Sequence, residues 1–194
     1  MSILDKLSQV EILLKHLPLR HDQQRHAGGD ALAMPSGPKR VRDAVEVAIG
    51  KLPHDHRALV KNLEITNTND PYSIGLADSA TGNIRIAGRT SVLDFEEYGE
   101  AAIHEVGHLV SDLGRFGLGN ASLEFSSKAK KFVGDMESAY RGSRKLISTQ
   151  AAFSVDEYIS ESYAHYVLKP DILKSGDPLG YSIVRDLFDG QEYT

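Results

Sequence analysis

The ten residues Ala101–Val110 read AAIHEVGHLV, and they decide how the rest of the chain is interpreted. They contain the motif HExxH, in which His104 and His108 stand four residues apart. On a helix this spacing places both imidazoles on one face, about a turn apart. Two imidazoles so placed can bind one zinc ion. Glu105 would then lie beside the metal rather than on it, which is where a general base for a metal-activated water belongs.

The apolar residues around the motif favour a helix that is mostly buried. Ile103, Val106, Leu109 and Val110 lie between and after the two histidines, whereas a surface helix with solvated histidines would be polar at such positions. Two buried histidines and a buried glutamate need partners. A metal ion would supply them.

The composition restricts the chemistry of any metal site. The chain has 194 residues, 41% of them hydrophobic and 25% charged, which fits one globular domain or one domain with a short arm. It has no cysteine, which excludes disulfides, thiolate zinc sites and cysteine nucleophiles. Any metal must therefore be held by histidines and carboxylates. The net charge of -5 argues against nucleic acid or an anionic membrane as the main partner. No apolar run is long enough to span a membrane.

The first 37 residues are interpreted as an arm that precedes the domain. Residues 1–6 lack the basic start and apolar block of a signal peptide. We therefore expect a protein that is cytoplasmic as made, or one that is secreted or injected by a route that needs no such peptide. Residues 3–18 have apolar positions at helical spacing and predict an amphipathic helix, which packs on the domain, binds a partner or lies on a membrane surface. Residues 19–38, rich in Gly and Pro, read as a flexible linker. The predicted boundaries are 1–37 for the helix and linker and 38–194 for the domain.

A small β region is expected between the first helix of the domain and the HExxH helix. The first helix is predicted over residues 38–52 and is ended by Pro53. A loop with His54 and His56, a weak metal-binding pair, follows it. Three strands are predicted at 59–66, 72–77 and 83–87, with turns at 67–71 and 79–83. We expect them to form a small, mostly antiparallel sheet. An edge strand of that sheet can hold a protein or peptide substrate in extended form by backbone hydrogen bonds.

The rest of the chain is predicted to be helical, which gives an α+β fold. Ser91 or Asp94 is expected to cap the HExxH helix, which should run to about Leu113 and be ended by Gly114 and Gly117. Further helices are expected at 121–142, at 156–168 before Pro170, and at 178–188.

A catalytic zinc site needs three protein ligands and one open position. Metzincins take the third ligand from a histidine six residues after the second one, but that position here is Gly114, so this class is excluded. A later helix offers Glu157 and Glu161, four residues apart, with His165 continuing the same face. One carboxylate can ligate the metal while the other accepts the N–H of a ligand histidine. The residue types do not say which carboxylate does which.

The two motifs together resemble a known family. HEVGHLVSD, followed by a helix with Glu157, Ser160, Glu161, Tyr163 and Ala164 and then Pro170, is similar to the zinc-peptidase domain of anthrax lethal factor and the Pro-Pro endopeptidases, which are gluzincins. The resemblance covers roughly residues 38–190, with specific matches only in the two helices. It implies a zincin-like α+β fold and one Zn²⁺ per chain. The metal would be held by His104, His108 and Glu157, with Glu161 as the partner of a ligand histidine.

The chain departs from this family at one residue. Gluzincins of this kind have a tyrosine one or two helix turns before the ligand glutamate, which stabilises the oxyanion, but residues 149–153 contain none. The alternatives are Tyr140, Tyr158, Tyr163, His165 and Gln150. A second family, the ImmA/IrrE-like peptidases, shares HExxH and a similar second helix, but it has Asn where this chain has Glu161.

These patterns predict a monomeric zinc endopeptidase that hydrolyses a protein substrate with Glu105 as the general base. A single small peptidase domain with an arm is similar to effectors or toxins delivered into another cell, by analogy alone. Two alternatives stay open. One is a metal-stabilised binding module with a decayed peptidase site, and the other is an ImmA-like regulatory peptidase.

Overall fold

The computed structural model describes residues 38–66, 74–88, 94–119, 121–142 and 146–189. All of them belong to the second of two compact units, Leu32–Thr194. The helix and linker expected over residues 1–37, the turn expected at 67–71 and the Ser91 cap lie outside the described residues.

The sheet has three strands, β1 (Asn62–Thr66), β2 (Gly75–Asp78) and β3 (Asn83–Ala87), in the order β1-β3-β2. β2 and β3 form the expected antiparallel hairpin, in which Gly82 adopts a positive φ of 71°. β1 pairs with β3 in parallel. The expectation of a mostly antiparallel sheet is therefore wrong. The hairpin folds back so that β3, and not β2, lies beside β1, and two reversals of direction leave β1 and β3 parallel.

One face of the sheet is buried. Ile84 and Ile86 of β3 are fully buried, and Leu63 and Ile65 of β1 lie beside them in register. Arg85 and Glu64 alternate with these residues, point to the opposite face and form an ion pair of 3.0 Å. The alternation agrees with the period-two pattern of the sequence.

The helices are α2 (Lys39–Ile49), α3 (His54–Arg57), α4 (Phe95–Phe116), α5 (Leu123–Gly142), α6 (Val155–Leu168), α7 (Pro170–Gly176) and α8 (Pro178–Phe188), with a 3₁₀ turn, η1 (Gln150–Ala152). α3, α7 and η1 were not expected. The described part of the chain is thus α+β and mostly helical.

The HExxH helix, α4, is longer than predicted. It begins at a capping box in which the Asp94 N–H donates to Glu97 at 2.6 Å. It continues through Gly114 and ends at Gly117, which adopts a left-handed φ of 67°. Gly114 does not end the helix. A Cβ there would lie 2.5 Å from the carbonyl oxygen of Ala129, so Gly114 is where α5 packs closely on α4.

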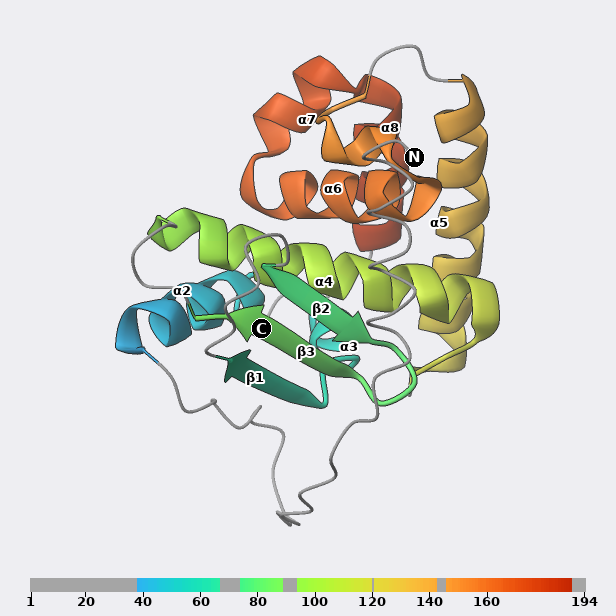
Figure 1. Ribbon diagram of the computed structural model, residues 1–194. Helices are drawn as coiled ribbons and strands as arrows, with labels where there is room; N and C mark the ends of the chain where they lie inside the picture. Colours follow the sequence, from blue (N-terminus) through green and yellow to red (C-terminus); the bar gives the residue numbers. More distant parts are fainter. Residues whose placement is uncertain (1–37, 67–73, 89–93, 120, 143–145, 190–194) are drawn as a thin grey trace, which may run out of the picture. The chain divides into compact units, whose positions relative to one another are not determined.

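α4 runs between two layers (Figure 1). The sheet and α2 pack on one side of it and α6 packs on the other, while α5 contacts its C-terminal half. Because α4 is enclosed on several sides, its central residues are buried almost all the way round.

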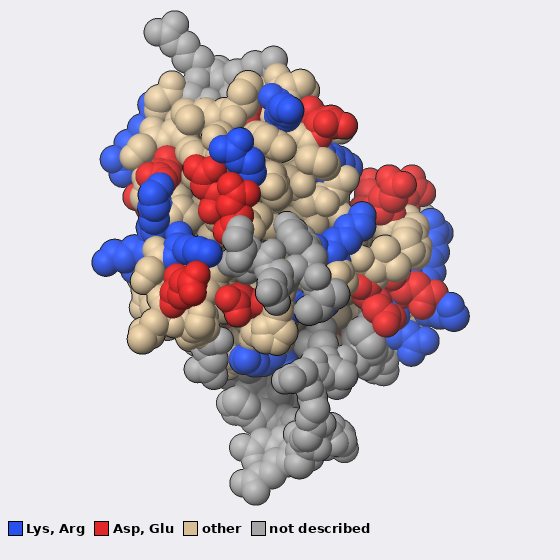
Figure 2. All heavy atoms as spheres, turned by 180° about the vertical axis from the view of Figure 1, so that it is seen from behind, with Lys and Arg blue, Asp and Glu red and all other residues tan. Residues whose placement is uncertain are grey.

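The described surface is mixed in charge. On the face that Figure 2 shows, acidic and basic side chains are interspersed rather than gathered by sign. Many belong to helical pairs such as Lys131 and Asp135, 2.5 Å apart and exposed, and such pairs stabilise little. Among the described helices, none combines the length and apolarity needed to cross a bilayer.

Candidate metal centre

The centre is built where α4 and α6 cross. A Cβ at Gly107 would lie 2.8 Å from the Cα of Ser160, so the two helix backbones come unusually close at this point. Glu157 and Glu161 stand either side of Ser160 on α6, and His104 and His108 stand either side of Gly107 on α4. The close crossing therefore brings both carboxylates over both histidines.

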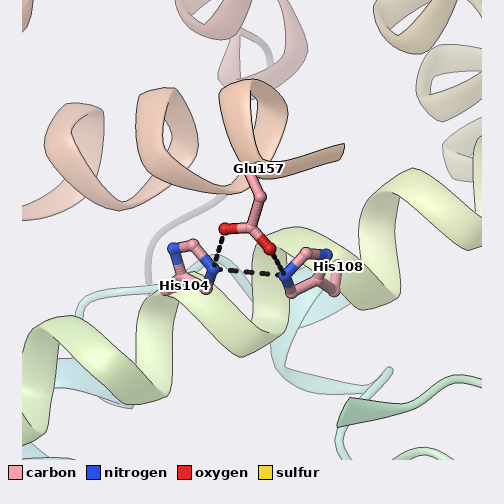
Figure 3. A group of neighbouring side chains, drawn as sticks. All are labelled: His104, His108 and Glu157. Carbon is pink, nitrogen blue, oxygen red and sulfur yellow. Dashed lines mark hydrogen bonds and ion pairs between the residues drawn. The ribbon is translucent and has the colours of Figure 1, made fainter. Parts of the chain in front are cut away.

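His104, His108 and Glu157 form one compact group (Figure 3). The Nε2 atoms of the two histidines are 3.1 Å apart. One carboxylate oxygen of Glu157 lies 3.2 Å from the His104 Nε2, and the other lies 3.6 Å from the His108 Nε2. Within the described residues this is the one group of three or more His, Asp or Glu side chains whose ligand atoms converge in this way.

These distances suit a metal ion. Ligand atoms bound at about 2.0–2.2 Å in a tetrahedral site lie about 3.3–3.6 Å from one another. The three distances observed, 3.1 Å between the two imidazoles and 3.2 and 3.6 Å from them to the two oxygens of Glu157, fall close to that range. Three ligand atoms leave one corner of a tetrahedron for a further ligand. The group could therefore hold a metal ion with an open coordination position.

Glu161 orients the imidazole of His104 through its Nδ1 atom. Its carboxylate lies 3.0 Å from the His104 Nδ1, so it accepts the N–H there and leaves Nε2 directed at Glu157. Burial opposes protonation of His104, but its hydrogen bonds to Glu157 and Glu161 outweigh burial and raise its pKa to about 10. The surrounding carboxylates thus favour a positive charge at this position. A proton on His104 or a divalent metal ion can supply it.

Glu157 is held at the start of α6. Its backbone N–H donates to the Oγ of Ser154, which caps the helix at 3.1 Å. Its side chain also accepts a hydrogen bond of 2.9 Å from the Nε2 of Gln150 in η1. Burial raises the pKa of Glu157, yet the hydrogen bond from His104 and the charges of His108 and His104 outweigh it and lower the pKa to about 2. Glu157 is therefore a carboxylate ready to bind a cation.

A second network ties α6 to α4 beside Glu157. The Arg115 guanidinium makes a short contact with the Asp156 carboxylate, and its Nε donates to Glu137 of α5 at 3.1 Å. The hydroxyl of Ser111 donates to the same Asp156 oxygen at 3.1 Å. Arg115 is largely buried. Because Asp156 precedes Glu157, this network fixes the end of α6 that carries the third side chain of the group.

Glu105 lies between α4 and the sheet. It is 6% exposed, and its carboxylate packs against the backbone of β2. The space exists because residue 75 is glycine: a Cβ there would lie 2.4 Å from the Oε1 of Glu105. Burial raises the pKa of Glu105 to about 7, although the charge of His104 and a hydrogen bond from the Ala77 backbone oppose the shift. A carboxyl group with such a pKa can take up and release a proton near neutral pH.

The structure does not bring the tyrosines considered above to this group. Tyr158 is fully buried, and its hydroxyl donates to Asp177 at 2.6 Å. Tyr163 is also fully buried, and its hydroxyl lies 2.6 Å from the Nδ1 of His56. Both tyrosines belong to a stretch of α6 that is buried at every position.

The other candidates are also engaged elsewhere. The Nδ1 of His165 bonds to the carbonyl oxygen of Glu161 at 2.9 Å, and its Nε2 faces Glu100 at 4.0 Å. The expected histidine pair is divided: His54 is exposed, whereas His56 is fully buried between Phe125 and Phe188. His56 is thus a core residue, and the loop expected at this pair is the helix α3.

Comparison with known proteins adds no family. No protein-family model and no curated protein sequence matches the chain. A function assigned to it must therefore follow from the geometry and chemistry of its own residues.

Proposed function

We propose that the chain is a zinc-dependent endopeptidase. One observation carries the proposal: Glu105 is a buried carboxyl group next to His104 on α4, and its charge interacts with those of His104 and Glu157. His104, His108 and Glu157 form a group of two imidazoles and one carboxylate whose atoms lie at metal-ligand spacing. Two histidines and a glutamate with one open position are a catalytic rather than a structural donor set for zinc. We assign His104, His108 and Glu157 as the ligands of one Zn²⁺ per chain. Glu161 fixes the tautomer of His104.

The roles of the side chains follow from their positions. A zinc ion held here would activate a water molecule and polarise the carbonyl group of the scissile peptide bond. Glu105 accepts a proton from that water as its oxygen forms a bond to the carbonyl carbon. The carbon–nitrogen bond then breaks, and Glu105 delivers the proton to the departing amine.

The substrate class follows from β2. This strand stands at one end of the sheet, in the order β1-β3-β2. Gly75 and Ala77 of β2 lie directly against Glu105. An extended peptide added beside β2 would run past the proposed general base. The proposed substrate is thus a protein or peptide in extended conformation.

The proposed peptidase activity can be tested by a search for new N-termini in other proteins. The purified protein is incubated with a denatured cell extract, with and without 1,10-phenanthroline, and new N-termini are sequenced. We expect new termini that chelation abolishes. Glu105→Ala should yield none while it retains zinc, because Glu105 is not a ligand. The matched control is Glu96→Ala, which removes an exposed carboxylate from the first turn of the same helix and should cleave normally.

Two results would contradict the proposal. Cleavage by Glu105→Ala at the wild-type rate would show that Glu105 is not the general base. A wild-type protein that binds zinc and produces no chelator-sensitive termini would instead favour a metal-stabilised binding module.

A further inference from the structure

Peptide hydrolysis places negative charge on the carbonyl oxygen, and a fixed hydrogen-bond donor at that oxygen is among the largest contributions to catalysis. The side chains of α5 and α6 that were candidates for this donor are bound elsewhere. The hydroxyls of Tyr158 and Tyr163 face Asp177 and His56. Tyr140 donates to the carbonyl oxygen of Ala152 at 3.3 Å.

Gln150, unlike these tyrosines, has its side chain directly beside Glu157. Its side-chain nitrogen lies 2.9 Å from the Oε2 of Glu157, and this same oxygen lies 3.2 Å from the His104 Nε2. The amide is therefore one hydrogen bond away from the proposed ligand atoms. Gln150 is an exposed residue and Glu157 is half-buried, so solvent, and hence a substrate, can reach Gln150. An amide nitrogen carries two hydrogens, and Glu157 accounts for one of them.

The turn that carries Gln150 is held firmly. The N–H of Ala151 donates to the Oγ of Ser148 at 3.0 Å, and the N–H of Phe153 donates to the carbonyl oxygen of Gln150 at 2.9 Å. Ala151 itself is fully buried, and η1 packs along α6. The backbone of Gln150 is thus fixed relative to Glu157. A donor fixed before the reaction needs no reorganisation during it.

We propose that the side-chain amide of Gln150 binds the carbonyl oxygen of the scissile peptide bond. One N–H holds the Oε2 of Glu157, and the second donates to the carbonyl oxygen as that oxygen gains negative charge. This role rests on the proposed peptidase function, which it deepens by naming the donor opposite Glu105.

The kinetic test uses the peptide best cleaved in the terminus search, at saturating zinc. Gln150→Ala should lower kcat about 100-fold, the effect of removing one such donor, and change KM far less. Gln150→Glu keeps the shape but replaces the donor by an acceptor, so its kcat should fall at least as far. The matched control, Thr149→Ala, changes an exposed neighbour that makes no side-chain capping bond in the same turn, and its kcat should stay at the wild-type value. If Gln150→Ala has the wild-type kcat at saturating zinc, Gln150 only holds Glu157, and the proposal is wrong.

A binding test separates this proposal from the peptidase function. Acetohydroxamic acid presents a carbonyl oxygen to a zinc ion, and calorimetry measures its affinity for the zinc-loaded protein without any cleavage. Loss of one hydrogen bond should weaken its binding to Gln150→Ala about 3- to 10-fold. Thr149→Ala should bind it as the wild type does. Equal affinities of the wild type and Gln150→Ala would overturn the role of Gln150, even if the protein cleaves peptides. A weaker affinity would support it, even if no cleaved substrate is found.

Discussion

Replacing Gly75 by alanine tests the position of Glu105 without altering any charged group. The added Cβ would lie 2.4 Å from the Oε1 of Glu105, 2.7 Å from its Cγ and 2.8 Å from its Cδ. Ordinary contacts begin at 3.4 Å, so the carboxylate must move by about 1 Å. The backbone of Gly75 is not in the left-handed region, and alanine can adopt its conformation. The side chain of Glu105, and not the strand, should therefore give way.

A displacement of this size should reduce catalysis strongly and stability little. Misplacing a reacting group by about 1 Å can cost about 100-fold in rate. This factor corresponds to about 2.7 kcal/mol of activation free energy. Zinc affinity should stay the same, because Glu105 is not among the proposed ligands. The melting temperature should also stay close to that of the wild type, since alanine is no worse than glycine inside a strand.

The measurement is kcat for the best-cleaved peptide, together with zinc content and melting temperature for each variant. Gly134→Ala is the matched control: it makes the same substitution on the exposed side of α5, where nothing lies within 4 Å of the new Cβ. It should raise stability by about 1 kcal/mol and leave kcat unchanged. A Gly75→Ala protein with wild-type kcat would refute the idea that this glycine positions Glu105. A Gly75→Ala protein that had lost its zinc would refute the claim that Glu105 is not one of the zinc ligands.

Two further predictions concern residues outside the ligand group. Arg115→Met removes the cation that holds Asp156, and it should weaken zinc binding about 10- to 100-fold in a chelator competition. The control, Arg141→Met, removes an exposed arginine from α5 and should leave zinc binding unchanged. Burial, with the charge of Lys128, lowers the pKa of His56 to about 3, whereas the pKa in the unfolded chain is about 6.5. The stabilisation from an uncharged His56 is thus complete above pH 6.5 and is lost as the pH falls toward 3, by up to about 1.4 kcal/mol per pH unit. Urea unfolding at pH 7 and pH 5 should show this loss in the wild type and not in His56→Gln, and equal losses in both would contradict it.

The local part of the group formed by His104, His108 and Glu157 could be predicted from the sequence. The spacing of His104 and His108 defines one helix face wherever the helix packs, and the same holds for Glu157 and Glu161. Spacing could not decide which carboxylate meets the two imidazoles. That depends on where α4 and α6 cross, and the crossing is set by Gly107 against Ser160. Such a contact between distant segments leaves no periodic signal.

The errors in the fold have the same origin. Gly114 has the appearance of a helix end, because glycine often follows the last turn. Its actual role is to admit the backbone of Ala129, and a glycine needed for close packing cannot be told from a capping glycine by local sequence. The parallel pairing of β1 with β3 is also non-local. The helix α3, only four residues long, is too short for a periodic pattern.

The tyrosines of α6 show why periodicity is weak on this helix. Every residue from Tyr158 to His165 is buried, so apolar and polar positions do not mark an inner and an outer face. Tyr163 faces the aromatic core around His56, while Glu161 faces His104. The proposed donor therefore lies outside the buried part of the helix. Gln150, in the turn before it, is such a residue.

The charges of the centre link its folding to its proposed metal. Glu105, Glu157 and Glu161 converge on His104, and burying three carboxylates around one imidazole is costly unless a cation is present. A proton on His104 balances one of these charges, and a proton on Glu105, whose pKa is about 7, can remove another. A divalent ion would replace the proton on the His104 Nε2 and supply a second positive charge. The same arrangement that is costly to bury without a cation is thus the one that could hold a metal ion.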